Sequence, residues 1–417
     1  AIDAAWRNSR QILTDMGQRL ADAHLDADVL TVAASGSLGR MEAVAGSDAD
    51  LIIVLRDGIL ADSPQGRHAC DAVWAALEPL QIQRSRSGGI FAIPTTPAAL
   101  CHPAARGRID EDLPTFGKRF QLLCDTQPIY GAAAYEQLLA NVIAWYTAAP
   151  PDQPSVPWWR YLLNDLIRYY RSLCAAAQWD HSQTVGFMRM RRFKLAHSRT
   201  VMYAALLCAL GECSRAAGDP QRQLHAALHL TPLERLAWSY AAAQDAGILT
   251  VTAVINRYLD ALGDTEFRRA LVDDASVTAI LQTGGAEILS RELSRFLNAQ
   301  QPRWKEDFAA GLPLQCTYDA ALRLVLPKNC ARVSSSVVRR SPDPAHDRPQ
   351  VSNSPQGASR SVPFTGLSPL RAGIRPAVYG GSWRGKTHKN STLVYGGSRC
   401  QGFSHQRKPQ SVQREAS

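Results

Sequence analysis

The chain has 417 residues, of which 46% are hydrophobic and 20% are charged, and these fractions are ordinary for a soluble globular protein. This composition excludes a wholly disordered chain, a collagen and a small disulfide-stapled domain. The longest apolar stretch, from Val201 to Leu210, has about half of the ~20 residues that a transmembrane helix needs, so no membrane span is expected. No basic segment followed by an apolar one opens the chain, so no signal peptide is expected either.

The net charge of +9 is distributed unevenly along the chain. Residues 334–417 contain 13 Lys or Arg and three acidic residues, whereas the rest of the chain has a net charge of −1. This segment also holds 15 Ser, 9 Gly and 8 Pro, a composition that buries too little apolar surface to offset chain entropy. We therefore expect residues 334–417 to be a disordered basic tail. The P-loop pattern from Gly380 to Thr387 lies in it without a buried strand before it, and we interpret the pattern as a chance match.

Nine cysteines are present, an odd number, and none of them forms a C-x-x-C pair. This pattern suggests neither a zinc site nor a disulfide framework. Reduced thiols in a cytoplasmic protein are the simplest interpretation.

The first third of the chain alternates between helix-like and strand-like segments. Apolar periodicity predicts helices over 5–24 and 68–80, and β-branched or apolar runs predict strands over 29–34, 50–55, 81–85 and 90–93. We expect residues 1–147 to form an α/β (α+β) domain with a small mixed sheet.

Long Ala-, Leu- and Arg-rich segments follow a proline-rich linker over 148–154. We expect an all-helical domain over 155–310, with breaks at Gly211, at Gly218-Asp219-Pro220 and at Gly263-Asp264. Thr231-Pro232 predicts a helix start, because threonine is a good N-cap and proline fits the first helical position.

The strongest functional pattern joins a predicted strand to a glycine turn and then to a second strand. It reads Gly36-Ser37-Leu-Gly39-Arg40-Met-Glu42, and it continues after four residues with Ser47-Asp48-Ala-Asp50-Leu-Ile-Ile-Val. A Gly-Ser turn lets backbone N–H groups approach a triphosphate. Alternate residues of a strand share a face, so Asp48 and Asp50 converge. Two carboxylates form a hard oxygen site that suits Mg²⁺.

This arrangement resembles the polymerase-β-like nucleotidyltransferase superfamily, in particular a branch of bacterial nucleotidyltransferases near the uridylyltransferase of the PII protein. The resemblance extends over about residues 5 to 300 and implies a nucleotidyltransferase fold. It implies that Gly36 and Ser37 contact the triphosphate and that Asp48 and Asp50 are catalytic metal ligands. Arg40 is a further nucleotide-binding candidate, and an Arg40–Glu42 ion pair is expected to fix the turn.

The superfamily usually supplies a third carboxylate from a later strand. The predicted strands 81–85 and 90–93 contain no acidic residue. We choose Asp110 as the third catalytic carboxylate over its neighbours Glu111 and Asp112 and over Glu78 on the preceding helix. If none of them serves, the site is incomplete.

Two basic stripes occur in the predicted helical domain. Asn164, Arg168 and Arg171 share one helix face, and Arg191, Lys194 and Ser198 share another. The resemblance continues here, and it makes Arg168 and Lys194 nucleotide-binding candidates for phosphate oxygens. The alternative for both stripes is a solvated charged face.

Together these patterns predict a magnesium-dependent transferase that binds ATP or another NTP. It would move the nucleoside monophosphate to a hydroxyl of an unknown acceptor, and a protein is one candidate for that acceptor. One alternative is a catalytically incomplete, nucleotide-binding regulatory module. Another is a helical interaction protein that binds nucleic acid through its basic tail.

Overall fold

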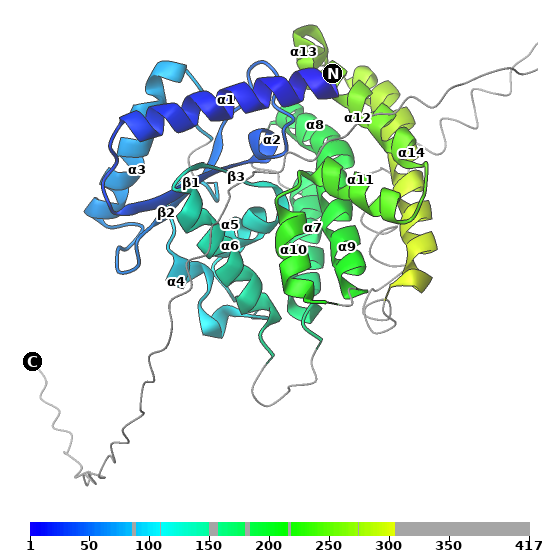
Figure 1. Ribbon diagram of the computed structural model, residues 1–417. Coiled ribbons are helices and arrows are strands. Elements are labelled where there is room, and N and C mark those ends of the chain that lie inside the picture. The colour runs from blue at the N-terminus through cyan, green and yellow to red at the C-terminus, as the bar shows by residue number, and fades with distance from the viewer. Residues whose placement is uncertain are drawn as a thin grey trace, which may run out of the picture. The chain divides into compact units, whose positions relative to one another are not determined.

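The computed structural model describes residues 1–304, except for 86–88, 109, 150–156, 180–183, 216–217, 274 and the side chains of 179 and 275–284. This part of the chain is mostly helical and contains a small three-stranded antiparallel sheet (Figure 1). No helix within it is long and apolar enough to cross a membrane. Residues 305–310, the predicted tail and the P-loop pattern lie outside the described residues.

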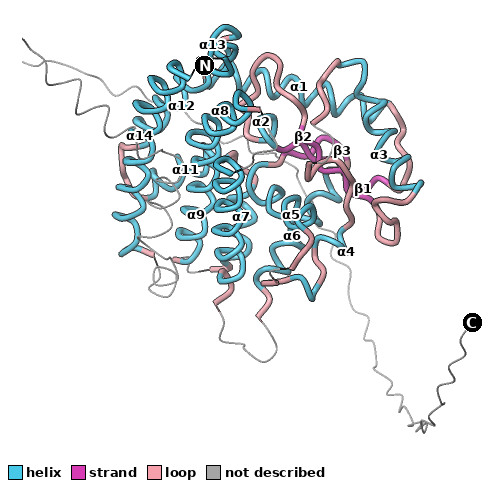
Figure 2. The backbone as a smooth tube through the Cα atoms, turned by 180° about the vertical axis from the view of Figure 1, so that it is seen from behind, coloured by secondary structure: helices cyan, strands magenta, loops and turns pink. Residues whose placement is uncertain are grey.

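The sheet has the strand order β2-β1-β3, and β1 pairs with both neighbours in the antiparallel sense. Figure 2 shows the three strands in magenta. Its strands are β1 (Val29–Ser35), β2 (Asp50–Leu55) and β3 (Gln127–Tyr130). The first two confirm the predicted strands 29–34 and 50–55. β3 was not predicted, because four residues that include Pro128 give little strand signal.

The predictions of a mixed sheet and of strands over 81–85 and 90–93 were wrong for the described residues. Arg84 and Thr95 each form one isolated parallel bridge, to Ala49 and to Val54 respectively. Pro94 precedes Thr95 and has no N–H group with which to extend a ladder. The two bridges therefore lie at Arg84 and just after the second segment, and neither extends into a strand.

Helices cover both faces of the sheet, which explains why β1 and β2 are apolar apart from Thr31, Ser35 and Asp50. Val32, Leu51 and Ile53 belong to a core with residues of α1 (Ile2–Asp22) and α3 (Pro64–Leu77). Their neighbours along the strands, Ala33, Ile52 and Val54, belong to a second core. That core includes residues of α5 (Leu113–Asp125) and α6 (Ala132–Thr147).

The predicted helical region is helical up to residue 303. Its elements are α7 (Arg160–Trp179), α8 (Val185–Lys194), the π-helical segment η3 (Leu195–Arg199), α9 (Thr200–Ser214), α10 (Pro220–Leu228), α11 (Pro232–Ala242), α12 (Ile248–Gly263), α13 (Thr265–Asp273), α14 (Ala275–Gln300) and η4 (Gln301–Arg303). Thr231 caps α11 in a capping box with Glu234. The predicted breaks before Pro220 and after Gly263 are confirmed.

The predicted break at Gly211 was wrong, because this residue lies inside α9. A Cβ atom at Gly211 would overlap the indole ring of Trp304. Glycine is therefore present for close packing of the ring on the helix, and it does not end the helix.

One hydrophobic core connects the sheet with the helical region. It runs from Ile52 through Phe120 and Leu139 to Leu166 and Leu206 of α7 and α9. A separate core lies among α9, α11, α12 and α14. Five short elements complete the described part: α2 (Gly36–Gly39), η1 (Glu78–Leu80), α4 (Pro97–Leu100), η2 (Pro103–Ala105) and η4, named above.

Candidate functional site

The Gly-Ser turn follows β1 directly as the one-turn helix α2. Gly36 has a φ of +67°, a conformation that side chains other than glycine rarely adopt. A Cβ atom at Gly36 would also overlap the carboxylate of Asp50. The strand register explains this approach, since Ser35 pairs with Asp50 across β1 and β2. The fold therefore brings the turn against the second aspartate of the motif.

Asp48 and Asp50 flank a residue whose side chain is fully buried. Ala49 packs in the core with residues of α1 and α3, so in extended backbone its two neighbours face the opposite side. Asp48 is exposed and Asp50 is half-buried. Burial, followed by the negative charge of Asp48, raises the pKa of Asp50 to about 6. The two carboxylates are thus close enough to repel each other electrostatically.

Two cations of the helical region lie close enough to these carboxylates to interact with them electrostatically. Burial lowers the pKa of Lys194, while the negative charges of Asp48 and Asp50 oppose that shift. The positive charge of Arg199 likewise attracts the Asp50 carboxylate and lowers the pKa of Asp50. Lys194 ends α8, and Arg199 ends η3. The structure therefore brings Lys194, a predicted site residue, to the aspartate pair, and adds Arg199 to it.

A buried polar network contacts the residues on either side of the Gly-Ser turn. Arg40 Nε donates to Glu42 Oε2 at 2.9 Å, which confirms the expected ion pair. Arg40 Nη1 donates to Asp125 Oδ2 at 2.5 Å. Ser35 Oγ lies 2.8 Å from Asp125 Oδ1. Because the Arg40 guanidinium is 8% exposed and engaged on two sides, its contacts orient the turn.

The π-helical segment η3 connects this network to the helical region. Thr200 Oγ1 donates to the carbonyl of Leu195 at 2.8 Å, and Ser198 Oγ donates to Glu42 Oε2. π-Bulges interrupt a helix at an energetic cost and occur often at functional sites. The segment lies between Lys194 and Arg199, and so it sets how these two cations are presented.

The predicted third carboxylate, Asp110, lies elsewhere. It is exposed and pairs with Arg108 at 2.7 Å. Besides Asp48, Asp125 is an acidic residue whose charge raises the pKa of Asp50, but both oxygens of Asp125 accept hydrogen bonds in the network. Within the part that the structure describes, Asp48, Asp50 and Asp125 do not bring three ligand oxygens within 4.8 Å of one another.

Arg168 is engaged in a different cluster. It pairs with Glu111 at 3.4 Å, donates to the carbonyl of Arg108 at 2.7 Å and lies over the ring of Phe116. The solvated-face alternative does not describe it, since its side chain is 29% exposed. The structure does not unite it with Lys194 through any of these contacts.

Two hollows lie on the surface of the described part of the chain. One, of about 300 Å³, is lined by residues 44–47 and by Asn8, Ile12 and Asp15. The other, of about 440 Å³, lies against α3 near His68. Neither is lined by Asp48 or Asp50, so the candidate site is defined by its charges and by the turn.

Sequence reasoning missed Asp125 and Arg199 as members of the site. Asp125 ends an amphipathic helix just before a strand too short to be recognised. Arg199 follows Ser198 directly, but helical periodicity gave no reason to prefer it to Arg191, because the π-helical turn alters the register.

No protein-family model matches the chain, and searches of curated proteins and of solved structures found no significant match.

Proposed function

We propose that the protein is a cytoplasmic, magnesium-dependent nucleotidyltransferase with a nucleotidyltransferase-type fold. It transfers a nucleoside monophosphate from an NTP to a hydroxyl of an acceptor. The observation that carries this proposal is the convergence of the Gly36 turn, the Asp48–Asp50 pair and the cations Lys194 and Arg199. Carboxylates for a metal and cations for phosphates are the two requirements of this chemistry.

The donor set of the aspartate pair fits Mg²⁺. It consists of carboxylate oxygens, which this hard cation prefers, and a bound cation would offset the burial and the repulsion from Asp48 that raise the pKa of Asp50. Asp48 and Asp50 would hold the ion, which would neutralise phosphate charge and orient the triphosphate for in-line displacement.

The chain's own residues divide the remaining work. Gly36 leaves room beside Asp50, and the N–H groups of the first turn of a helix have no partners within it. Lys194 and Arg199 would bind the outer phosphate oxygens in place of Arg168, whose contacts lie with Glu111. The acceptor oxygen forms a bond to the α-phosphorus as the bond to pyrophosphate breaks. The proton of the acceptor hydroxyl is transferred to a base.

A second function is favoured by one observation. The superfamily's third carboxylate commonly assists the acceptor hydroxyl, whereas Asp125 is held between Arg40 and Ser35. An Asp125 fixed in this way orients the turn but is not free to take a proton. A nucleotide-binding regulatory module would have these properties.

A transfer assay tests the proposal and separates the two functions. The full-length chain is incubated with Mg²⁺, each α-labelled NTP in turn and a cell extract, and labelled acceptor and pyrophosphate are measured. We expect both products with one NTP, and we expect neither with Asp48→Ala or Asp50→Ala. The matched control is Asp71→Ala, which removes a carboxylate that is 74% exposed on α3 and should keep the activity. NTP binding without pyrophosphate release would indicate the regulatory module.

A further inference from the structure

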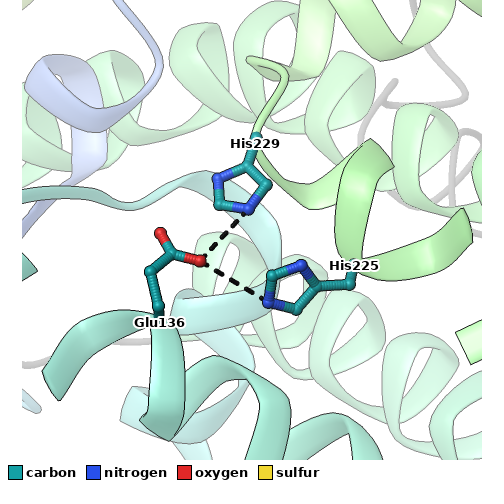
Figure 3. Close-up of side chains that lie close together, drawn as sticks. All are labelled: Glu136, His225 and His229. Atoms are coloured by element: carbon teal, nitrogen blue, oxygen red, sulfur yellow. Dashed lines mark ion pairs between the residues drawn. The ribbon is translucent and has the colours of Figure 1, made fainter. Parts of the chain in front are cut away.

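Three potential metal ligands meet away from the aspartate pair. Glu136 lies on α6, His225 lies on α10, and His229 follows that helix directly (Figure 3). Their ligand atoms all lie within 4.8 Å of one another, a proximity that no other trio of His, Cys, Asp or Glu reaches among the described residues. Figure 3 shows both imidazole rings directed at the carboxylate.

Local structure explains how the two histidines converge. They are four residues apart, a spacing that places side chains on one helix face. His229 has φ −74° and ψ −17°, so the helical turn continues through it. The rings lie 5.0 Å apart, centroid to centroid, in an edge arrangement. The pair is thereby presented as a unit to α6, which α10 contacts.

Two of the distances among the three ligand atoms match those of a zinc coordination sphere. The Nε2 atoms of His225 and His229 lie 3.5 and 3.3 Å from the same oxygen of Glu136. Two ligands held about 2.1 Å from a tetrahedral zinc ion lie about 3.4 Å apart. The donor set of two imidazoles and one carboxylate suits Zn²⁺ and disfavours Mg²⁺, which prefers oxygen ligands.

We propose that Glu136, His225 and His229 form a Zn²⁺ site that joins α6 to α10. The ligands leave a fourth position open, and the side chains are 30% to 45% exposed, so the ion has access from solvent. The site is independent of the aspartate pair. It links the part of the chain that carries the sheet to the helical region, and its metal stabilises that connection.

The full-length chain, stripped of metal with a chelator, tests this proposal by titration with Zn²⁺ alone. The wild type is expected to bind one equivalent more than the variant His225→Gln/His229→Gln. Glu136→Gln should weaken binding at this site at least tenfold, and so should each single histidine variant. Zn²⁺ should raise the melting temperature of the wild type and leave that of the double variant unchanged.

Two controls separate this site from other metal binding. His102→Gln changes an exposed histidine outside the cluster, and Asp48→Ala removes part of the aspartate pair; both should keep the additional equivalent. Circular dichroism checks that each variant is folded. Equal zinc stoichiometry and affinity in the wild type and the double variant would overturn the proposal and leave Glu136 as an ion-pair partner of two histidines.

Discussion

Asp50 shows how the candidate site opposes the stability of the protein. The strand register fixes it beside Gly36, and its burial and the charge of Asp48 raise its pKa from 3.8 to about 6. A group with a raised folded-state pKa binds its proton more tightly in the folded protein than in the unfolded chain. Ionised Asp50 therefore destabilises the metal-free fold. Residues that carry such a cost are typical of functional sites.

The substitution Asp50→Asn should stabilise the metal-free protein above pH 6. The native carboxyl favours folding below the unfolded pKa of about 4, and this contribution is lost as the pH rises through about 6. A shift of about two units corresponds to ~3 kcal/mol. The gain from Asp50→Asn should thus be largest at pH 7 to 8 and should vanish near pH 4. Chemical unfolding across this range in the presence of a chelator measures it.

Asp71→Asn serves as the matched control, because this aspartate is exposed and lies 3.9 Å from Arg84. It should change stability by less than ~1 kcal/mol at every pH. If Asp50→Asn did not raise the free energy of unfolding at pH 7, the ionised Asp50 carboxylate would not destabilise the metal-free fold, contrary to this prediction.

The amino-acid sequence allowed part of the site to be predicted at this scale. The glycine, the serine and the two aspartates lie close together in the sequence, beside two apolar strands. Short-range rules for turns and strands are therefore enough to predict that they meet. Asp125 lies 75 residues after Asp50 in the chain. Its role depends on hydrogen bonds from Ser35 and Arg40, which no local pattern specifies.

At the scale of elements, the one-turn helix α2 is the part of the site with the least steric freedom. Gly36 combines a positive φ with the close approach of Asp50. Gly39 is also confined, since a Cβ atom there would overlap the carbonyl of Asp125. The turn is therefore packed between the second aspartate and the end of α5.

Gly36→Ala should destabilise the protein by about 1–3 kcal/mol because of backbone strain, and it should also displace the Asp50 carboxylate. We expect Mg²⁺-dependent NTP binding to weaken at least tenfold. Gly58→Ala is the matched control. Gly58 has a φ of +93° but open space around its Cα atom, so the change should cost stability without affecting binding. Thermal unfolding and NTP titration measure both effects. Equal NTP affinity in Gly36→Ala and the wild type would separate the turn from the site.

Elements with strong periodicity or a clear cap were predictable, whereas those set by tertiary contact were not. Thr231-Pro232 begins α11 as expected. The segments 81–85 and 90–93 have apolar residues, but the bridges near them are single ones, at Arg84 and at Thr95, which follows the second segment. The π-helical turn at Leu195–Arg199 has no sequence signal of its own, and it is associated with contacts of Ser198 and Thr200.

At the scale of the molecule, Arg235 joins the two parts of the chain that meet at the site. Its side chain is fully buried. It donates to the carbonyls of Ala227 and Leu228 at the end of α10 and of Leu123 and Cys124 at the end of α5. Helix C-termini carry partial negative charge, which favours a cation there. The position of Asp125 at the end of α5 therefore depends on a residue of α11.

Arg235→Met should lower the free energy of unfolding by about 3 kcal/mol or more, since it leaves buried carbonyl groups without donors. Arg215→Met is the control, because Arg215 is 38% exposed and pairs with Glu212; it should cost less than ~1 kcal/mol. Chemical unfolding of both variants measures the difference. Similar unfolding midpoints would show that the connection through Arg235 contributes little to stability.

Equilibrium binding of NTPs to the full-length chain, with and without Mg²⁺, tests directly whether the aspartate pair holds the metal for a bound nucleotide. We expect the wild type to bind one or more NTPs in a Mg²⁺-dependent manner. Asp48→Ala and Asp50→Ala should lose the Mg²⁺ dependence, while Asp71→Ala should bind as the wild type does. NTP binding by both aspartate variants with unchanged Mg²⁺ dependence, or no NTP binding by the folded wild type, would contradict the account.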